Sequence, residues 1–226
     1  AAFITIWLQW INTLVWYPTI LSFIAGTAAY LINPELAQNK AYLISVILIV
    51  FWFLTFLGLK GLKTSTAVAS FCAITGMIIP MGIIILLAIL WLIQGHPIAV
   101  SLKWHALIPH FGDTQSWGSL TAIVTSFLGM ELAAVHVRNV KNPQKNFPRA
   151  MGFSVILILS TMILGSLAIA FILPANDIGL VQGVMQAFTQ FFDAYHLASL
   201  MPIMIIMLLL GSLGSMINWI ISPAKG

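Results

Sequence analysis

Charged residues are scarce in this sequence. Asp, Glu, Lys and Arg make up 6% of its 226 residues, whereas hydrophobic residues make up 61%. A soluble domain carries about 25% charged residues, so the composition excludes an ordinary soluble domain and indicates a membrane protein. The net charge is +4, but the basic residues of a membrane protein mainly report its orientation. We therefore expect a lipid bilayer around the chain and no nucleic-acid partner.

Cysteine and the common catalytic motifs are also nearly absent. The one cysteine, Cys72, excludes a disulfide or a cysteine-based metal site within the chain. The segment GLKGLKTS lacks the glycine that a P-loop places before Lys63, and neither H-E-x-x-H nor G-x-S-x-G occurs. The five histidines show no close ligand spacing. We expect no enzyme, no cofactor and no metal ion.

Long apolar stretches are what the sequence does contain. A bilayer core about 30 Å thick requires about 20 apolar residues of helix, and the alternation typical of a membrane barrel is absent. The sequence predicts an all-α, polytopic helix bundle, with residues 1–226 forming one partial transmembrane domain. The six predicted spans are Phe3–Ile32, Ala41–Leu59, Thr66–Ile93, Trp117–Val137, Met151–Leu173 and Leu200–Ile221. Because both ends of the chain lie at apolar runs, we expect an internal fragment of a longer protein.

The basic residues predict which side of the membrane each gap faces. Seven of the nine fall in gaps on one side and two, Lys40 and Lys103, on the other. By the positive-inside rule the side with seven is cytoplasmic. The seven are Lys60, Lys63, Arg138, Lys141, Lys145, Arg149 and Lys225.

The last external gap, Pro174–Ser199, has a helical apolar pattern but is too short and too polar to span. Its apolar positions are Val181, Val184, Phe188, Phe191 and Tyr195. The pattern is typical of a helix that covers the outer face of the bundle. Two interpretations stay open, an amphipathic loop helix packed on the bundle and a gating lid.

Glu131 is the only acidic residue within a predicted span. A carboxylate near a helix centre costs about 2.5–3.5 kcal/mol on insertion scales, so it usually faces a cavity or a partner. Burial favours the neutral form of a carboxyl group. Glu131 follows Ser126 and Gly129, a composition that favours a helix break, and transporters bind substrates at broken helices. Glu131 either braces a neighbouring helix or takes part in gating or proton coupling.

The segment SFLGMELAAVHVRNVKNPQKNFPRA resembles the sixth helix and following loop of amino acid–polyamine–organocation permeases. GSLGSMINWIISPAKG is similar to the eighth helix of that family, and WLQWINTLVWYPTILSFIAGTAAYL to its third. The third-helix WYP and the eighth-helix ending favour the bacterial glutamate/GABA antiporter-like branch. The resemblance implies a partial leucine-transporter-type fold with inverted repeats, here helices three to eight, in a bacterial plasma membrane.

The resemblance also implies site residues. The broken sixth helix implies backbone contacts to an amino acid substrate from Ser126, Leu128 and Gly129, and an acidic position at Glu131. Thr125 stands where some relatives have a gating Trp, and we include it among the substrate-binding candidates. Protons are a candidate coupling ion.

Four further candidates come from the third and eighth helices. Trp219 matches an eighth-helix Trp that lines the pathway, although packing or a place in the interfacial aromatic belt would also explain it. Asn12, Trp16 and Tyr17 fall near the part of helix three that faces the pathway.

The implied function is secondary amino acid transport by alternating access, with antiport as the expected mode. A non-transporting scaffold or an inactive fragment is the alternative. An intramembrane enzyme that uses Glu131 with His136 is disfavoured, because residues five apart lie about 140° apart around a helix. The identity of the amino acid and the oligomeric state are left open by the sequence.

Overall fold

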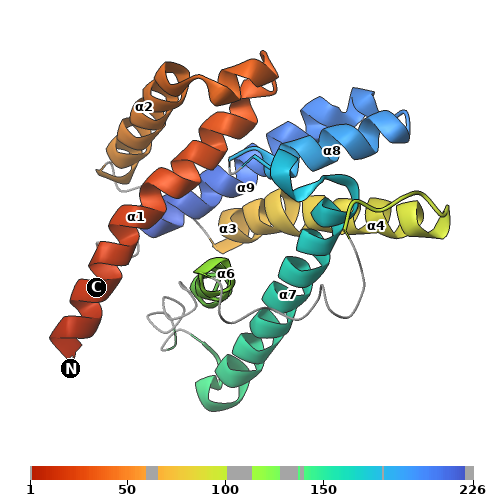
Figure 1. Cartoon of the computed structure of the whole chain (residues 1–226). Helices are drawn as coiled ribbons and strands as arrows, with labels where there is room; N and C mark the ends of the chain where they lie inside the picture. Colours follow the sequence, from red (N-terminus) through yellow and green to blue (C-terminus); the bar gives the residue numbers. More distant parts are fainter. Residues whose placement is uncertain are drawn as a thin grey trace.

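The computed structural model describes residues 2–59, 66–100, 114–127, 137, 140–179 and 181–221. Every regular element in these residues is a helix, and they contain no strand, which confirms the all-α prediction (Figure 1). The elements are α1 (Ala2–Ala29), η1 (Pro34–Gln38), α2 (Lys40–Leu59), α3 (Thr66–Ala73), η2 (Ile74–Ile78), α4 (Ile79–Ile93), α6 (Thr114–Thr125), α7 (Pro143–Ile172), η4 (Ala175–Asp177), α8 (Gly183–Ala194), η5 (Ala198–Leu200) and α9 (Met201–Ile221).

Four helical stretches among the described residues have the length and hydropathy needed to cross a bilayer: Lys40–Leu57, Ser70–Ile93, Pro143–Ile172 and Ala198–Ile217. Helix α1 contains 28 residues and is therefore about 42 Å long. Helix α6 covers the first part of the predicted span 117–137, and most of the remainder lies outside the described residues. The six spans themselves stay a prediction.

Helix α7 begins at Pro143, well before the predicted span at Met151. Proline is favoured in the first helical turn, where its missing N–H would have no partner. Asn142 precedes the helix in the left-handed conformation, with φ 51°. Its carbonyl accepts from the backbone N–H of Asn146 at 3.0 Å. The basic segment is therefore the first part of a helix as well as a topology signal.

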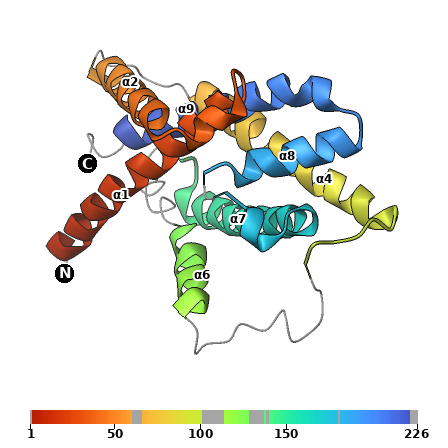
Figure 2. The ribbon, with the colours of Figure 1, turned by 45° about the horizontal axis from the view of Figure 1, so that its top comes forward.

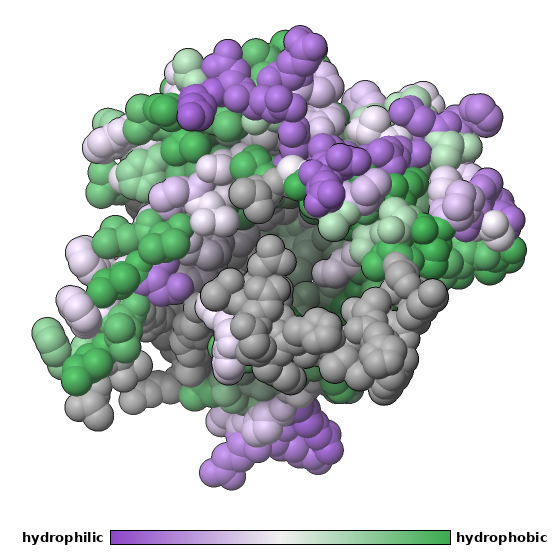
Figure 3. Space-filling model, in the orientation of Figure 1, coloured by the Kyte–Doolittle hydropathy of each residue, from purple (hydrophilic) through white to green (hydrophobic). Residues whose placement is uncertain are grey.

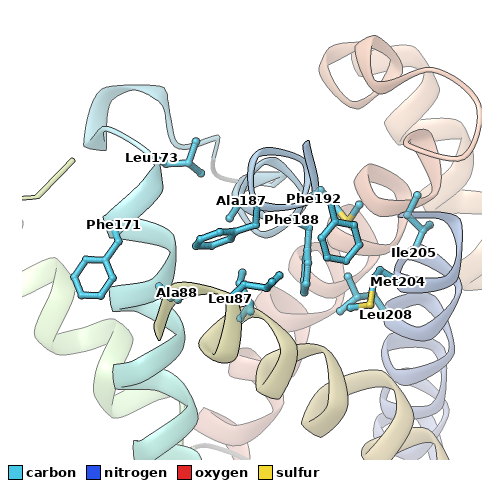
Figure 4. Close-up of a cluster of buried hydrophobic side chains, with 14 residues drawn as sticks. Leu87, Ala88, Phe171, Leu173, Ala187, Phe188, Phe192, Met204, Ile205 and Leu208 are labelled. Carbon is cyan, nitrogen blue, oxygen red and sulfur yellow. The ribbon is translucent and has the colours of Figure 1, made fainter. Parts of the chain in front are cut away.

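One apolar core joins α4, α7, α8 and α9 (Figure 4). Three phenylalanines of α8, Phe188, Phe191 and Phe192, are exposed by 2% or less. They lie among Leu87 of α4 and Met204 of α9. Helix α8 is thus anchored in the core, as expected for the amphipathic helix packed on the bundle. The gating lid stays a prediction.

A second apolar core joins α1, α2 and α9 through Leu21, Ile24, Leu54 and Met216. Figure 2 shows α1 and α2 on one side of the molecule and α4, α7 and α8 on the other, with α9 running between the two groups. Helix α9 contributes buried residues to both cores. It is therefore the element through which the two groups of helices are joined.

The third apolar stretch is interrupted by one π-helical turn, η2, between α3 and α4. Pro80 lies two residues after this turn and is fully buried. A proline has no N–H and its ring collides with the carbonyl four residues earlier, so a wider turn relieves that collision. The turn places Gly76 directly against Gly211 of α9.

Candidate functional site

Three of the candidate pathway residues meet between α1 and α9. The Trp16 and Trp219 rings are stacked, with centroids 4.5 Å apart and planes inclined by 25°. Tyr17 lies edge-on to Trp16 at 6.0 Å. All three side chains are half-buried. We call Trp16, Tyr17 and Trp219 the aromatic cluster.

A hydrogen bond ties the aromatic cluster to the backbone of α9. The Tyr17 hydroxyl donates to the Trp219 carbonyl at 3.2 Å. Trp219 lies in the last turn of α9, where carbonyls have no donor within their own helix. Tyr17 therefore supplies a donor that α9 lacks. The Tyr17 ring also lies 6.1 Å from the Phe51 ring, which connects the cluster to α2.

Asn12 lies on α1 one helical turn before Trp16 and is half-buried. Residues four apart lie on the same helix face, so Asn12 lies on the same face of α1 as Trp16 and places an amide next to the aromatic cluster. Its amide can both donate and accept hydrogen bonds. That combination suits an amino acid, which carries an ammonium and a carboxylate.

Helix α6 ends at Thr125, directly before Ser126, the first residue of the composition that favours a helix break. The hydroxyls of Thr121 and Thr125 donate to the carbonyls four residues earlier, each at 2.9 Å. The Ser126 hydroxyl donates to the Ile123 carbonyl at 2.7 Å. Such side-chain bonds compete with the regular helical pattern and often bend it. Ser154 and Thr189 make the same kind of bond inside α7 and α8, so these bonds accompany the end of α6 without being its sole cause.

The other candidates of the broken helix, Leu128, Gly129 and Glu131, lie outside the described residues. The break and the position of the carboxylate consequently stay predictions. Among the described candidates, the structure brings together the three residues of the aromatic cluster. Thr125 and Ser126, in contrast, bond to carbonyls of their own helix.

The sequence reasoning missed the contact that positions α9. A methyl group added at Gly211 would lie 2.6 Å from the Gly76 Cα and 2.9 Å from its carbonyl oxygen. A methyl group at Gly214 would lie 2.6 Å from the Cys72 Cβ. Small residues at such spacing allow membrane helices to approach closely. Those glycines in an apolar run were the signal that could have predicted this crossing.

A polar network outside the apolar core connects α1 with α8. The Tyr30 hydroxyl lies 3.4 Å from the Gln182 side-chain oxygen. The Gln186 side chain accepts from the Gly179 N–H at 2.8 Å and donates to the Asp177 carbonyl at 3.2 Å. At the end of α8, burial raises the pKa of the Tyr195 hydroxyl. The Tyr30–Gln182 contact joins the segment before α8 to the end of α1, and the two Gln186 bonds hold that segment against α8.

A family model for amino acid permeases matches residues 1–226, the whole chain. The chain belongs to the amino acid permease family. This confirms the family predicted from the helix motifs, and with it a partial all-α permease fold. Together with the four long apolar helices, it makes the chain part of an integral, multi-pass membrane protein.

Curated relatives cover the chain from end to end. An uncharacterized transporter of Legionella pneumophila is 42% identical over 100% of this chain and 48% of its own length. A glutamate/gamma-aminobutyrate antiporter of Lactococcus lactis is 31% identical over 99% of this chain and 45% of its own length. A probable agmatine/putrescine antiporter of the same species is 20% identical over 94% and 44%. The permease chain thus spans about half the length of the curated relatives it matches.

Proposed function

We propose that the full-length protein containing this chain exchanges amino acids across a bacterial plasma membrane by alternating access. The observation that carries the proposal is the match, over almost the whole chain, to antiporters named for glutamate and gamma-aminobutyrate. Their bacterial source supports the choice of membrane. Glutamate and gamma-aminobutyrate are consequently the first pair of substrates to test.

The aromatic cluster supports this proposal because its chemistry suits an amino acid. Tryptophan faces attract cations, contributing about 0.5–1 kcal/mol when exposed and more when desolvated. Trp16 and Trp219 are stacked on each other between α1 and α9, so an ammonium group would meet a ring face turned away from that stack. Asn12 adds an amide one turn away. On this proposal the cluster lines one wall of the pathway. Thr125, Ser126, Leu128 and Gly129 would contribute backbone carbonyls from another wall.

Glu131 completes the proposal as the group that couples transport to protons. A carboxyl group in an apolar span can exchange its proton when the site opens to water on either side. A purely bracing role makes a different prediction, because a brace needs a hydrogen bond and no change of charge. The two roles are separated by the Glu131→Gln variant discussed below.

The test is exchange by the full-length protein in liposomes. Vesicles loaded with gamma-aminobutyrate should take up labelled glutamate, and empty vesicles should take up much less. Exchange of agmatine for putrescine alone would move the substrate class to diamines. Absence of exchange with all four compounds, by protein that elutes as a single folded species, would contradict transport and favour the scaffold.

An enzyme would be recognised by a different result. It would convert its substrate in detergent, where no second compartment exists, and the recovered compound would be chemically altered. We expect glutamate and gamma-aminobutyrate to be recovered unchanged from both detergent and liposome samples.

A further inference from the structure

Three exposed basic side chains, Lys141, Lys145 and Arg149, lie at or just before the start of α7. Lys145 and Arg149 are four residues apart within the helix and so share one face, and Lys141 lies two residues before the helix begins. We call these three residues the basic stripe. The Asn146 side-chain amide donates to the Lys141 carbonyl at 2.6 Å, which fixes the residue before the helix. Figure 3 shows a hydrophilic patch at the bottom of the molecule, where α7 begins in Figure 1.

No acidic residue lies in the first turn of α7. The acidic side chains that the structure describes, Glu35, Asp177 and Asp193, belong to η1, η4 and α8. These elements lie at the other end of the bundle (Figure 1). Cations at the start of a helix also oppose its macrodipole. Within the described part of the chain, the basic stripe therefore has unbalanced positive charge.

The same face of α7 continues as an apolar stripe. Phe153 is 75% exposed and Ile156 is 63% exposed, and Leu157, Ile163 and Leu164 are exposed as well. The buried residues of α7, Gly165, Ala168 and Phe171, belong to its second half. The span from Arg149 to Leu157 is about 12 Å, close to the depth of one leaflet, about 15 Å. The first half of α7 therefore presents positive charge at the membrane surface and exposed apolar side chains at the depth of one leaflet.

We propose that this face of α7 binds an anionic phospholipid of the leaflet that its basic end faces. The phosphate lies between Lys145 and Arg149, within reach of Lys141, and an acyl chain follows Phe153, Ile156 and Leu157. A free anion would use only the charges, and an uncharged lipid only the apolar stripe. A ligand with an anionic head and an apolar tail matches both parts of the face. The inference is independent of the substrate proposed above.

Native mass spectrometry of the full-length protein tests the proposal, with phosphatidylglycerol and phosphatidylcholine added at equal concentrations. Wild-type protein should retain phosphatidylglycerol preferentially. A basic residue near an anionic surface changes affinity about fivefold, so K145Q/R149Q should weaken phosphatidylglycerol binding about thirty-fold. The charge-conserving variant K145R/R149K should retain it. Phe153→Ala should lower retention of phosphatidylglycerol without altering its preference over phosphatidylcholine.

Lys40→Gln is the matched control, because Lys40 is an exposed cation at the start of another long helix, α2. It should leave phosphatidylglycerol binding unchanged. Equal losses in Lys40→Gln and K145Q/R149Q would overturn the proposal in favour of general surface charge. Equal retention of the two lipids by wild-type protein would also overturn it, and would indicate that another protein segment covers this face. If inorganic phosphate at the same concentration as the lipid displaced phosphatidylglycerol, the site would be a simple anion site. That result would reject the proposed binding of an acyl chain along Phe153, Ile156 and Leu157.

Discussion

Replacing Gly76 with alanine should destabilise the protein, whereas the same replacement at Gly82 should not. A methyl group at Gly76 would meet the backbone of Gly211 and would lie 2.7 Å from the Met207 carbonyl oxygen. Carbon atoms pack best about 3.5–4.0 Å apart, so α9 would have to move away by about 1.5–2 Å to clear the Gly211 Cα. At Gly82 nothing lies within 4 Å of the added methyl group.

The sizes of these effects follow from the contacts. Overpacking a tight interface costs about 1–3 kcal/mol, and Gly76 is at the upper end because its neighbours are backbone atoms that cannot rotate away. Alanine is favoured over glycine in a helix by about 0.8–1.0 kcal/mol, which offsets part of that cost. Gly82→Ala has the gain without the collision. Because both variants share the helix gain, they should differ by the collision cost alone, about 3 kcal/mol, or about 6–12 °C in Tm for a folding unit of about 150–250 residues.

The assay is thermal unfolding of the full-length protein in one detergent, with matched heating rates because unfolding of such proteins is often irreversible. Gly211→Ala should resemble Gly76→Ala, since each added methyl group meets the other helix. A Gly76→Ala protein with the Tm of the wild type or higher would refute the close crossing of η2 and α9.

The remaining predictions concern the aromatic cluster and the carboxylate. Trp219→Ala should lower exchange at least tenfold while Trp219→Phe keeps more of it; equal losses of folded protein and flux would instead indicate packing alone. Tyr17→Phe removes the hydrogen bond to the Trp219 carbonyl and should lower the free energy of unfolding by about 0.5–1.5 kcal/mol. The measurement is a small decrease in Tm, and Trp16→Phe, which leaves this hydrogen bond in place, is its comparison. Glu131→Gln should flatten the pH dependence of exchange without lowering expression, and an unchanged pH–flux curve would leave only the bracing role.

The elements of the fold that follow from local sequence were predictable. Long apolar runs require helices, because backbone groups in a bilayer must be satisfied within the segment. The residue types that favour a break, Ser126 and Gly129, stand just after the end of α6 at Thr125. Trp16, Tyr17 and Trp219 were each chosen separately, and the structure shows that they touch. Their role in transport stays a prediction.

The features that depend on distant contacts were not predictable in the same way. Gly76 packs against Gly211, which is far from it in the chain. The hydrophobic pattern does not predict which glycine of one helix contacts which glycine of another. The apolar pattern of α8 predicted a helix on the bundle surface, but Met185 and Ala187 are buried as well as the predicted Phe188 and Phe191. A helix that inserts between three others buries more than one face, and only their arrangement determines which residues are covered.

The position of α9 links the glycine crossing to the aromatic cluster. Trp219 lies eight residues after Gly211 on α9, a distance of about 12 Å along the axis. A rotation of α9 by about 10° around the crossing would therefore displace Trp219 by about 2 Å. Ring stacking at 4.5 Å does not survive such a displacement, because aromatic attraction requires close, offset contact. The Trp16–Trp219 stack and the Tyr17 hydrogen bond therefore oppose such a rotation near the end of α9, while the close contact of Gly76 with Gly211 holds α9 at the crossing.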